Sequence, residues 1–117
     1  MSKPPLTTMG SPEQNDAVRE AVAEHGDDGS AVRHVIHYAY PYPHADLSAK
    51  PHLMDLLRSN GFAVKDAFAN NGVVLEHHSS VTPSDFDPLT ASLRDWLHDQ
   101  GWEYDGWECE VIQGGVN

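Results

Sequence analysis

Apolar and polar positions follow two different periods along this chain, one typical of strands and one typical of helices. The clearest strand covers residues 32–40, where β-branched and aromatic residues predominate and Pro41 ends the run. Successive side chains of a strand point to opposite faces. One face carries Val35, His37 and Ala39, and the other carries Ile36, Tyr38 and Tyr40. Both faces are partly apolar, which predicts a strand in the middle of a sheet.

Three further strands are expected later in the chain. Residues 62–68 and 73–79 flank an Asn-Asn-Gly sequence at 70–72, and Asn-Gly between two apolar runs favours a hairpin of antiparallel strands. The last strand is expected over residues 102–112. The Asp-Gly pair at 105–106 predicts a β-bulge within it, because glycine lets the backbone bend there.

Helical patterns occupy the segments between these strands. The first helix is expected to begin after the N-cap Ser11, with Pro12 at its first position, and to end at Gly26. A second is expected from about Ser48 to Asn60, and a third ends before Gly101. Apolar residues recur every three to four positions in the last two: Leu53, Leu56 and Leu57, then Leu89, Leu93, Trp96 and Leu97. The first helix has only a thin apolar stripe, which predicts an appendage on the core.

After the first helix, the order strand, helix, strand, strand, helix, strand predicts an α+β fold. Two split β-α-β units give a ferredoxin-like α/β sandwich, in which both later helices cover one face of a four-stranded antiparallel sheet. The other face is left for the N-terminal helix, a second subunit or a partner. We expect a single domain over residues 11–112, a disordered segment over 1–10 and a frayed C-terminus over 113–117.

Charge narrows the possible partners. The chain has 18 acidic residues against 7 lysines and arginines, a formal net charge of -11, and the acids are spread along its length. Such a surface repels nucleic-acid phosphates and attracts a basic protein segment. Solubility alone is the alternative explanation for this charge. With a single cysteine and no apolar run of signal-peptide or membrane-spanning length, the chain is expected in the cytoplasm.

Eight histidines raise the question of a metal or small-ligand site. Four of them, His34, His37, His77 and His78, lie on two strands that the fold makes neighbours. Adjacent residues of a strand point to opposite faces, so His77 and His78 cannot both converge with His37. A site using His37 and His77 remains the alternative to histidines that only form hydrogen bonds.

The sequence gives only weak support for catalysis and for RNA binding. Cys109 lies between Glu108 and Glu110, whose charges raise a thiol pKa, so we expect a packing residue and no catalytic residues. Tyr38 and Tyr40 resemble the base-stacking aromatics of RNA-binding sheets. The acidic charge opposes that role, and we expect these tyrosines to pack under the helices instead.

The segment at 103–109, Glu-Tyr-Asp-Gly-Trp-Glu-Cys, is the most distinctive in the chain. Tyr104 and Trp107 each have an apolar body and a polar tip, so their burial requires hydrogen-bond partners. The sequence from Tyr104 through Asp105 and Gly106 to Trp107 resembles the closing signature of the bacterial family called regulator of ribonuclease E activity B (RraB). The likeness covers roughly residues 11–112.

The resemblance implies a protein inhibitor without chemistry or cofactor of its own. It would dock on the basic C-terminal scaffold of ribonuclease E, change the partners of that enzyme in the degradosome and so modulate RNA degradation. Ribonuclease E or another RNA-decay protein with a basic segment is therefore the expected partner. The candidate contacts, chosen for charge and expected exposure, are Asp27, Asp28, Glu103, Asp105, Glu108 and Glu110.

Overall fold

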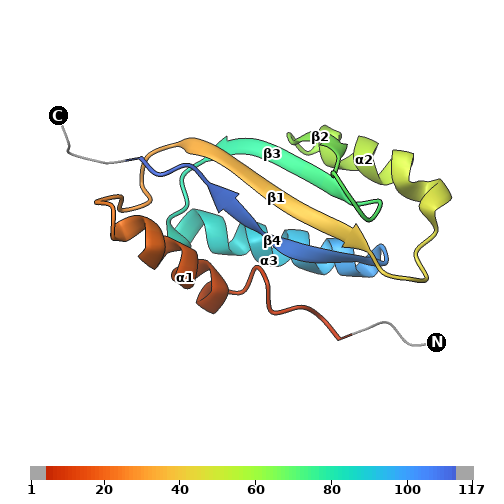
Figure 1. The fold of residues 1–117 in the computed structure, drawn as a ribbon, viewed down its shortest axis with the longest axis horizontal. Helices are drawn as coiled ribbons and strands as arrows, with labels where there is room; N and C mark the ends of the chain where they lie inside the picture. Colours follow the sequence, from red (N-terminus) through yellow and green to blue (C-terminus); the bar gives the residue numbers. More distant parts are fainter. Residues whose placement is uncertain (1–4, 113–117) are drawn as a thin grey trace.

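The computed structural model describes residues 5–112. Its helices are α1 (Pro12–Ala23), α2 (Lys50–Ser59) and α3 (Pro83–Asp99), and the 3-10 turn η1 (Leu47–Ala49) leads into α2 (Figure 1). The strands are β1 (Arg33–Pro41), β2 (Ala63–Asp66), β3 (Val73–Ser79) and β4 (Trp102–Cys109). Residues 1–4 and 113–117, which include the C-terminus expected to fray, lie outside the described residues.

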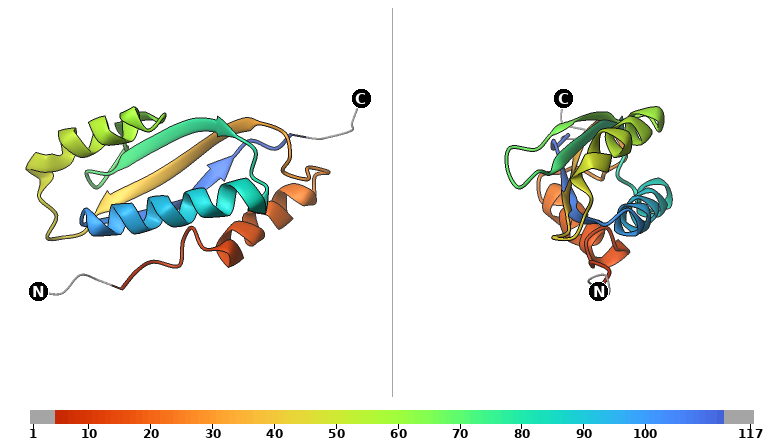
Figure 2. Two further views of the ribbon diagram at one scale, coloured as in Figure 1. Left: turned by 180° about the vertical axis from the view of Figure 1, so that it is seen from behind. Right: turned by 90° about the vertical axis from the view of Figure 1, so that its right-hand side faces the viewer.

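The strands form a four-stranded sheet in the order β2-β3-β1-β4, and all neighbouring strands are antiparallel. The expected α+β fold, with an antiparallel sheet and an additional N-terminal helix, is confirmed. Strand β1 is central, as its two partly apolar faces predict. Helices α2 and α3 lie on the same side of the sheet (Figure 2, right).

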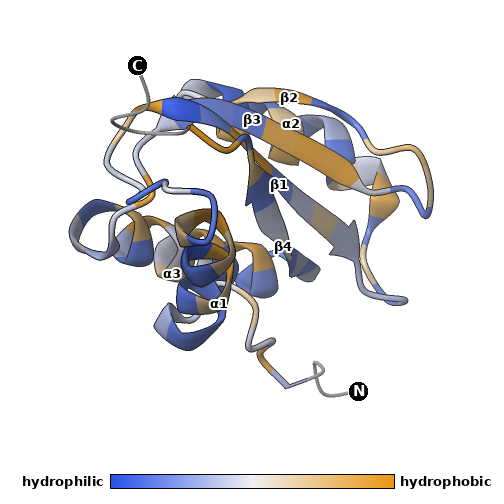
Figure 3. Ribbon diagram, turned by 60° about the vertical axis from the view of Figure 1, so that its left-hand side comes forward, coloured by the Kyte–Doolittle hydropathy of each residue, from blue (hydrophilic) through white to orange (hydrophobic). Residues whose placement is uncertain are grey.

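The core lies between the sheet and these two helices. Val35 and Ala39 of β1 are fully buried there against apolar residues of both helices. Tyr38 and Tyr40 are only half-buried and point to the opposite face, so the expectation that they pack under the helices is wrong. In β3 an apolar first half is followed by a polar second half (Figure 3). We call the side of the sheet that carries Tyr38 and Tyr40 the open face.

Local backbone geometry confirms the hairpin and the bulge. Asn70 and Asn71 both have φ of 58°, the left-handed conformation that asparagine tolerates, in the turn between the antiparallel strands β2 and β3. In β4 the pairing with β1 shifts between His37 and Ala39, which places the bulge at residues 105–106. Gly106 has φ of +97°, which a residue with a Cβ rarely adopts.

The N-terminal segment is more ordered than its composition predicts. The Ser11 hydroxyl accepts a hydrogen bond from the Gln14 amide and caps α1, as expected. Immediately before this cap, Gly10 is buried and Met9 packs against the core, so the expected disorder is wrong for these two residues. Helix α1 lies beside α3 and the edge strand β4 (Figure 2) and leaves the open face uncovered.

Candidate functional site

The aromatic residues of the 103–109 segment point into the molecule and find the polar partners that their burial requires. The Tyr104 hydroxyl is 2.7 Å from Nδ1 of His37, and the Trp107 indole donates to Oδ1 of Asn15 at 2.7 Å. Tyr104 is fully buried and Trp107 is 9% exposed. The two aromatic residues of the signature therefore hold the fold together from inside.

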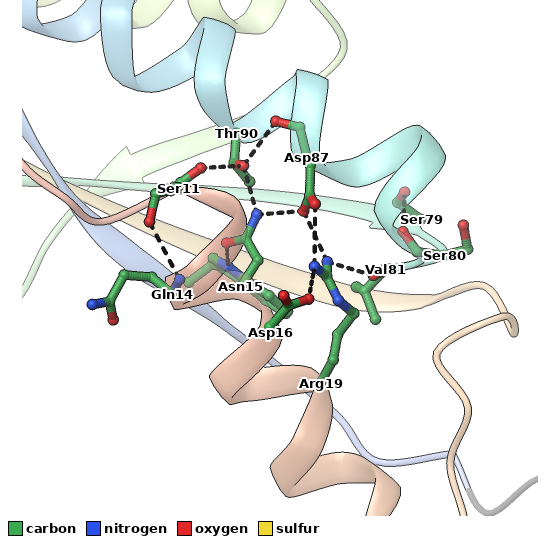
Figure 4. A network of polar contacts seen from close by, with 12 residues as sticks. Ser11, Gln14, Asn15, Asp16, Arg19, Ser79, Ser80, Val81, Asp87 and Thr90 are labelled. Atoms are coloured by element: carbon green, nitrogen blue, oxygen red, sulfur yellow. Dashed lines mark hydrogen bonds and ion pairs between the residues drawn. The ribbon is translucent and has the colours of Figure 1, made fainter.

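Asn15 is the centre of a buried polar network between α1, α3 and β4 (Figure 4). Its amide nitrogen donates to Oδ1 of Asp87 and to Oγ1 of Thr90, both at 2.8 Å. Thr90 in turn donates to the Gly10 carbonyl at 2.8 Å. Helix α1 is thus attached by buried hydrogen bonds, which its thin apolar stripe did not reveal. The only sequence signal was an asparagine within that stripe.

Arg19 extends this network toward the surface. Its guanidinium donates to both carboxylate oxygens of Asp87, at 2.8 and 3.2 Å, and to the Val81 carbonyl at 3.2 Å. Burial alone would raise the pKa of Asp87, but the hydrogen bonds from Arg19 and Asn15 outweigh it and lower that pKa. The carboxylate of Asp87 therefore stays charged and joins α3 to α1.

A second buried ion pair removes one of the predicted contact residues from the surface. Asp27 is 2% exposed and its carboxylate binds the guanidinium of Arg33, which is 1% exposed. Asp27 also accepts the backbone amides of Gly29 and Ile112, at 2.9 and 2.8 Å. The exposure expected for Asp27 is wrong, because these donors satisfy its charge inside the fold; they also lower its pKa, Arg33 most strongly. Asp28 is exposed.

The strand histidines separate into two pairs on opposite faces of the sheet. His34 and His78 stack on the open face with ring centroids 5.3 Å apart. His37 and His77 lie on the helical side, where their Nε2 atoms are 2.8 Å apart. As the alternation of strand side chains predicted, His77 and His78 do not both converge with His37.

The His37–His77 pair has the geometry of a hydrogen bond, in which one nitrogen donates and the other accepts. His37 is fully buried, and its second nitrogen is engaged by Tyr104. Burial, and secondarily the proximity of His77, lowers the pKa of His37 to about 3. Within residues 5–112 no group of three or more His, Cys, Asp or Glu side chains is arranged to hold a metal ion. The alternative metal or small-ligand site therefore gains no support from this geometry.

The predicted acidic residues of β4, with which we group Glu110 directly after the strand, lie at the edge of the sheet, next to the open face. Glu103 pairs with Tyr40 and Glu108 pairs with Ile36, so both carboxylates share the face of the β1 tyrosines. Asp105, Glu108 and Glu110 are exposed and Glu103 is half-buried. The structure thus brings together four of the six candidate contacts. Asp28 lies in the loop before β1, and Asp27 is buried below it.

Tyr38 connects the aromatic and the acidic part of the open face. Its hydroxyl donates to Oε1 of Glu108, and this hydrogen bond is the main reason why the pKa of Tyr38 is raised to about 12. On β3, the other strand next to β1, the Glu76 carboxylate forms salt bridges with His34 at 2.8 Å and with Lys65 at 3.1 Å. The acidic charge on β4 is therefore less compensated than the charge on β3.

Cys109 behaves as the packing residue that the sequence predicts. It is half-buried and packs against the core. Burial is the largest influence on its thiol and raises the pKa, although the neighbouring Arg33 acts in the opposite direction. A thiol with a raised pKa provides little thiolate for nucleophilic chemistry at neutral pH.

Comparison with known proteins decides the family. The sequence profile described as "Regulator of ribonuclease activity B" matches residues 12–109, from the start of α1 to the end of β4. The chain belongs to the RraB family. A search of curated proteins found no significant match. The RraB match covers α1 as well as the sheet, so Asn15, its side-chain partners Asp87, Thr90 and Trp107, and the signature lie within the matched region.

Membership of the RraB family implies regulation of a ribonuclease, and hence a protein partner. No helix within residues 5–112 is long and apolar enough to cross a membrane.

Proposed function

We propose that this RraB-family chain regulates ribonuclease E, or another RNA-decay enzyme with a basic segment, by binding that segment with the acids of β4. It acts in the cytoplasm and without catalysis. The observation that carries the proposal is the row of Glu103, Asp105, Glu108 and Glu110 beside the half-buried tyrosines of the open face. Within residues 5–112 no salt bridge joins these four acids to a lysine or arginine.

An arginine-rich segment suits this surface chemically. A guanidinium is planar, pairs with carboxylates through two hydrogen bonds and stacks on aromatic rings. Tyr38 and Tyr40 provide such rings next to Glu108 and Glu103. The formal net charge of -11 adds long-range attraction, which increases the rate of encounter with a basic partner.

The strand order and connections also support a ferredoxin-like assignment, which we include in the proposal. In such folds an open sheet face with aromatics can bind RNA. Here Tyr38 already donates its hydroxyl to Glu108, and the surrounding carboxylates repel phosphates. A basic protein segment is therefore a better partner for this face than RNA.

The proposal is tested by binding to the purified C-terminal scaffold of ribonuclease E, measured by isothermal titration calorimetry. The double variant Glu103→Lys/Glu108→Lys is expected to bind at least about tenfold more weakly, because it reverses two charges at the docking surface. Inhibition of RNA cleavage by the intact ribonuclease should weaken in parallel.

The matched control is Glu13→Lys/Glu20→Lys, which makes the same change in net charge at two exposed positions of α1. Its binding should fall much less. Equal losses in the two double variants would mean that only net charge matters and would contradict docking at β4. No binding by the wild-type chain would reject ribonuclease E as the partner.

A further inference from the structure

The turn between β2 and β3 carries an aromatic side chain that the fold does not cover. Phe68 has a relative exposure of 107%, and the next most exposed large apolar residue within residues 5–112, Val32, reaches 68%. A single exposed apolar side chain is common on protein surfaces, so the surroundings of Phe68 decide whether it has a role.

The turn that presents Phe68 has a defined backbone. The Ala67 amide donates to the Gly72 carbonyl at 2.8 Å, and the Gly72 amide donates to the Ala69 carbonyl at 3.2 Å. Both asparagines at 70–71 adopt the left-handed conformation that the tight turn requires. A side chain presented on a backbone fixed in this way loses little conformational freedom on binding, which favours affinity.

Tyr40 joins this turn to the open face. A Cβ atom added to Gly72 would lie 2.5 Å from two carbons of the Tyr40 ring, so the ring packs directly over the glycine at the end of the turn. In the other direction across the sheet, Tyr40 pairs with Glu103 of β4. The turn projects away from α2 and α3, toward the side that the open face occupies (Figure 2, right). The acids, the tyrosines and Phe68 therefore border one continuous surface.

The order of the strands sets the distance between the acids and the turn. In the order β2-β3-β1-β4, the strands β4 and β2 are three strand spacings apart. At about 4.8 Å each, these spacings amount to about 14 Å, which an extended chain covers with about five residues. One short segment of a partner can therefore reach the acids of β4 and Phe68 at the same time.

From these features we infer that Phe68 is an apolar anchor for the same basic segment that the acids of β4 bind. The inference rests on the proposed function and specifies the segment further. The segment carries arginines for Glu103 and Glu108 and, about five residues away, a large apolar side chain that covers Phe68. The charges steer the segment to the open face, and the contact with Phe68 adds affinity that salt does not screen.

Charge favours this occupant over a second copy of the chain and over RNA. A second copy also carries a formal net charge of -11, so contact between two open faces would bring their acids together. A base of single-stranded RNA can stack on an exposed phenylalanine, but its phosphates would then lie near Glu103 and Glu108. A basic segment compensates the same acids while it covers the ring.

Two synthetic peptides of about ten residues are the probes. Both have arginines in the middle, and one has a leucine at each end where the other has serines, so that either direction of binding presents an end residue to Phe68. Binding is measured by isothermal titration calorimetry at about 0.05 M and about 0.3 M NaCl. The leucine peptide should bind the wild-type chain at least about fivefold more tightly than the serine peptide, by the same factor at both salt concentrations.

Variants of the chain assign this advantage of the leucine peptide to Phe68. Phe68→Ala should abolish the advantage, and Phe68→Leu, which keeps a large apolar group, should retain most of it. The control is Leu56→Ala, which shortens an exposed apolar residue of α2, on the opposite side of the sheet, and should retain the advantage. Because the Phe68 ring is exposed, Phe68→Ala should unfold at the same urea concentration as the wild-type chain.

Three results would overturn the inference: equal binding of the two peptides by the wild-type chain, a leucine advantage that persists in Phe68→Ala, and no binding of either peptide. The variant Glu103→Lys/Glu108→Lys separates the inference from the proposed function. If it weakens binding of the serine peptide while Phe68→Ala keeps the leucine advantage, docking at β4 stands and the anchor is rejected. If it leaves the serine peptide unaffected while Phe68→Ala removes the leucine advantage, docking at β4 is rejected and the anchor is supported.

Discussion

His37 is an ionisable side chain held in the centre of the fold. Its ring is fully buried and contacts Phe62 and Phe86, and the only hydrogen bonds that the ring forms within residues 5–112 are with Tyr104 and His77. Protonation would place a charge in this environment, and burial is the main cause of its lowered pKa. In the native protein His37 therefore stays neutral over the pH range in which the same side chain becomes protonated in the unfolded chain.

This difference makes stability depend on pH in a defined window. The folded pKa of His37 is about 3 and the unfolded value is 6.5, so the unfolded state binds more protons between them. Stability should fall as pH decreases below 6.5, by about 1.4 kcal/mol per unit, so that about 2 kcal/mol is lost by about pH 5. The pKa of His77 is also lowered, again chiefly by burial, and acts in the same direction. Urea unfolding at about pH 7.5 and about pH 5 measures the loss.

The variant His37→Gln keeps hydrogen-bonding capacity without titrating, and its stability should change less between the two pH values. His52→Gln, at an exposed position of α2, is the control and should retain the wild-type dependence. Equal pH dependence in both variants would show that His37 is not responsible. Asp27 does not interfere, because its lowered pKa causes loss of stability only below the carboxyl value of 3.8.

The sequence was least informative about the tertiary contacts and the burial of individual residues. The need of Tyr104 and Trp107 for polar partners was predictable from their chemistry, but the identity of those partners, His37 and Asn15, depends on tertiary packing. The same holds for Asp27, whose position next to Asp28 gives no sign that Arg33 lies beneath it. Burial of a charged residue is decided by a partner distant in space, which pattern alone does not specify.

Helix α1 shows how an element with little apolar surface can still be part of the folded unit. Val22 is buried and Val18 packs against the core, but the polar contacts of Asn15 and Arg19 provide the specific connections to α3 and β4. Every buried side-chain nitrogen and oxygen within residues 5–112 has a hydrogen-bond partner. A fully satisfied buried network fixes one orientation of the helix, because any other leaves polar groups unpaired.

Replacement of Asn15 by alanine should release α1. The change leaves the Trp107 indole without a partner and removes the hydrogen bonds that Asp87 and Thr90 accept from the Asn15 amide, and an unsatisfied buried group costs about 1–3 kcal/mol. We expect the free energy of unfolding to fall by about 2–4 kcal/mol, with faster hydrogen exchange in α1. Gln14→Ala, at the exposed neighbouring position, should change stability by less than about 0.5 kcal/mol. A similarly small effect of Asn15→Ala would show that the network does not attach the helix.

The helices and strands themselves were predicted well, because caps, turns and helix ends are marked by residues close together in the sequence. Ser11 and Pro12 place the start of α1, the Asn-Gly turn places the β2–β3 hairpin, and Gly101 separates α3 from β4. The residues of β1 and its neighbours in the sequence did not show which face of β1 is buried. Ile36, Tyr38 and Tyr40 are the larger apolar residues, yet the helices cover the face of Val35, His37 and Ala39. The choice depends on which face suits Leu57, Phe86 and Leu97 across the core.

For the whole molecule, the excess of acidic residues means that added salt should increase stability but decrease affinity for a basic partner. A formal net charge of -11 destabilises the compact state through self-repulsion, and salt screens it. From about 0.02 M to about 0.3 M NaCl, we expect the free energy of unfolding to rise by about 1 kcal/mol. Affinity for the basic scaffold of ribonuclease E should fall over the same range. Calorimetric titration beside urea unfolding checks both, and affinity that rises with salt would argue against electrostatic docking.

The order of strands in the sheet has a consequence for synthesis of the protein. The central strand β1 needs β4 on one side, and within residues 5–112 β4 is the last helix or strand along the sequence. While the ribosome is still making α3, the edge of β1 is unpaired and His37 and Asn15 lack Tyr104 and Trp107. Non-local pairing of this kind forms late, and an unpaired central strand exposes a surface prone to aggregation. The fold can therefore close only when the signature segment has left the exit tunnel.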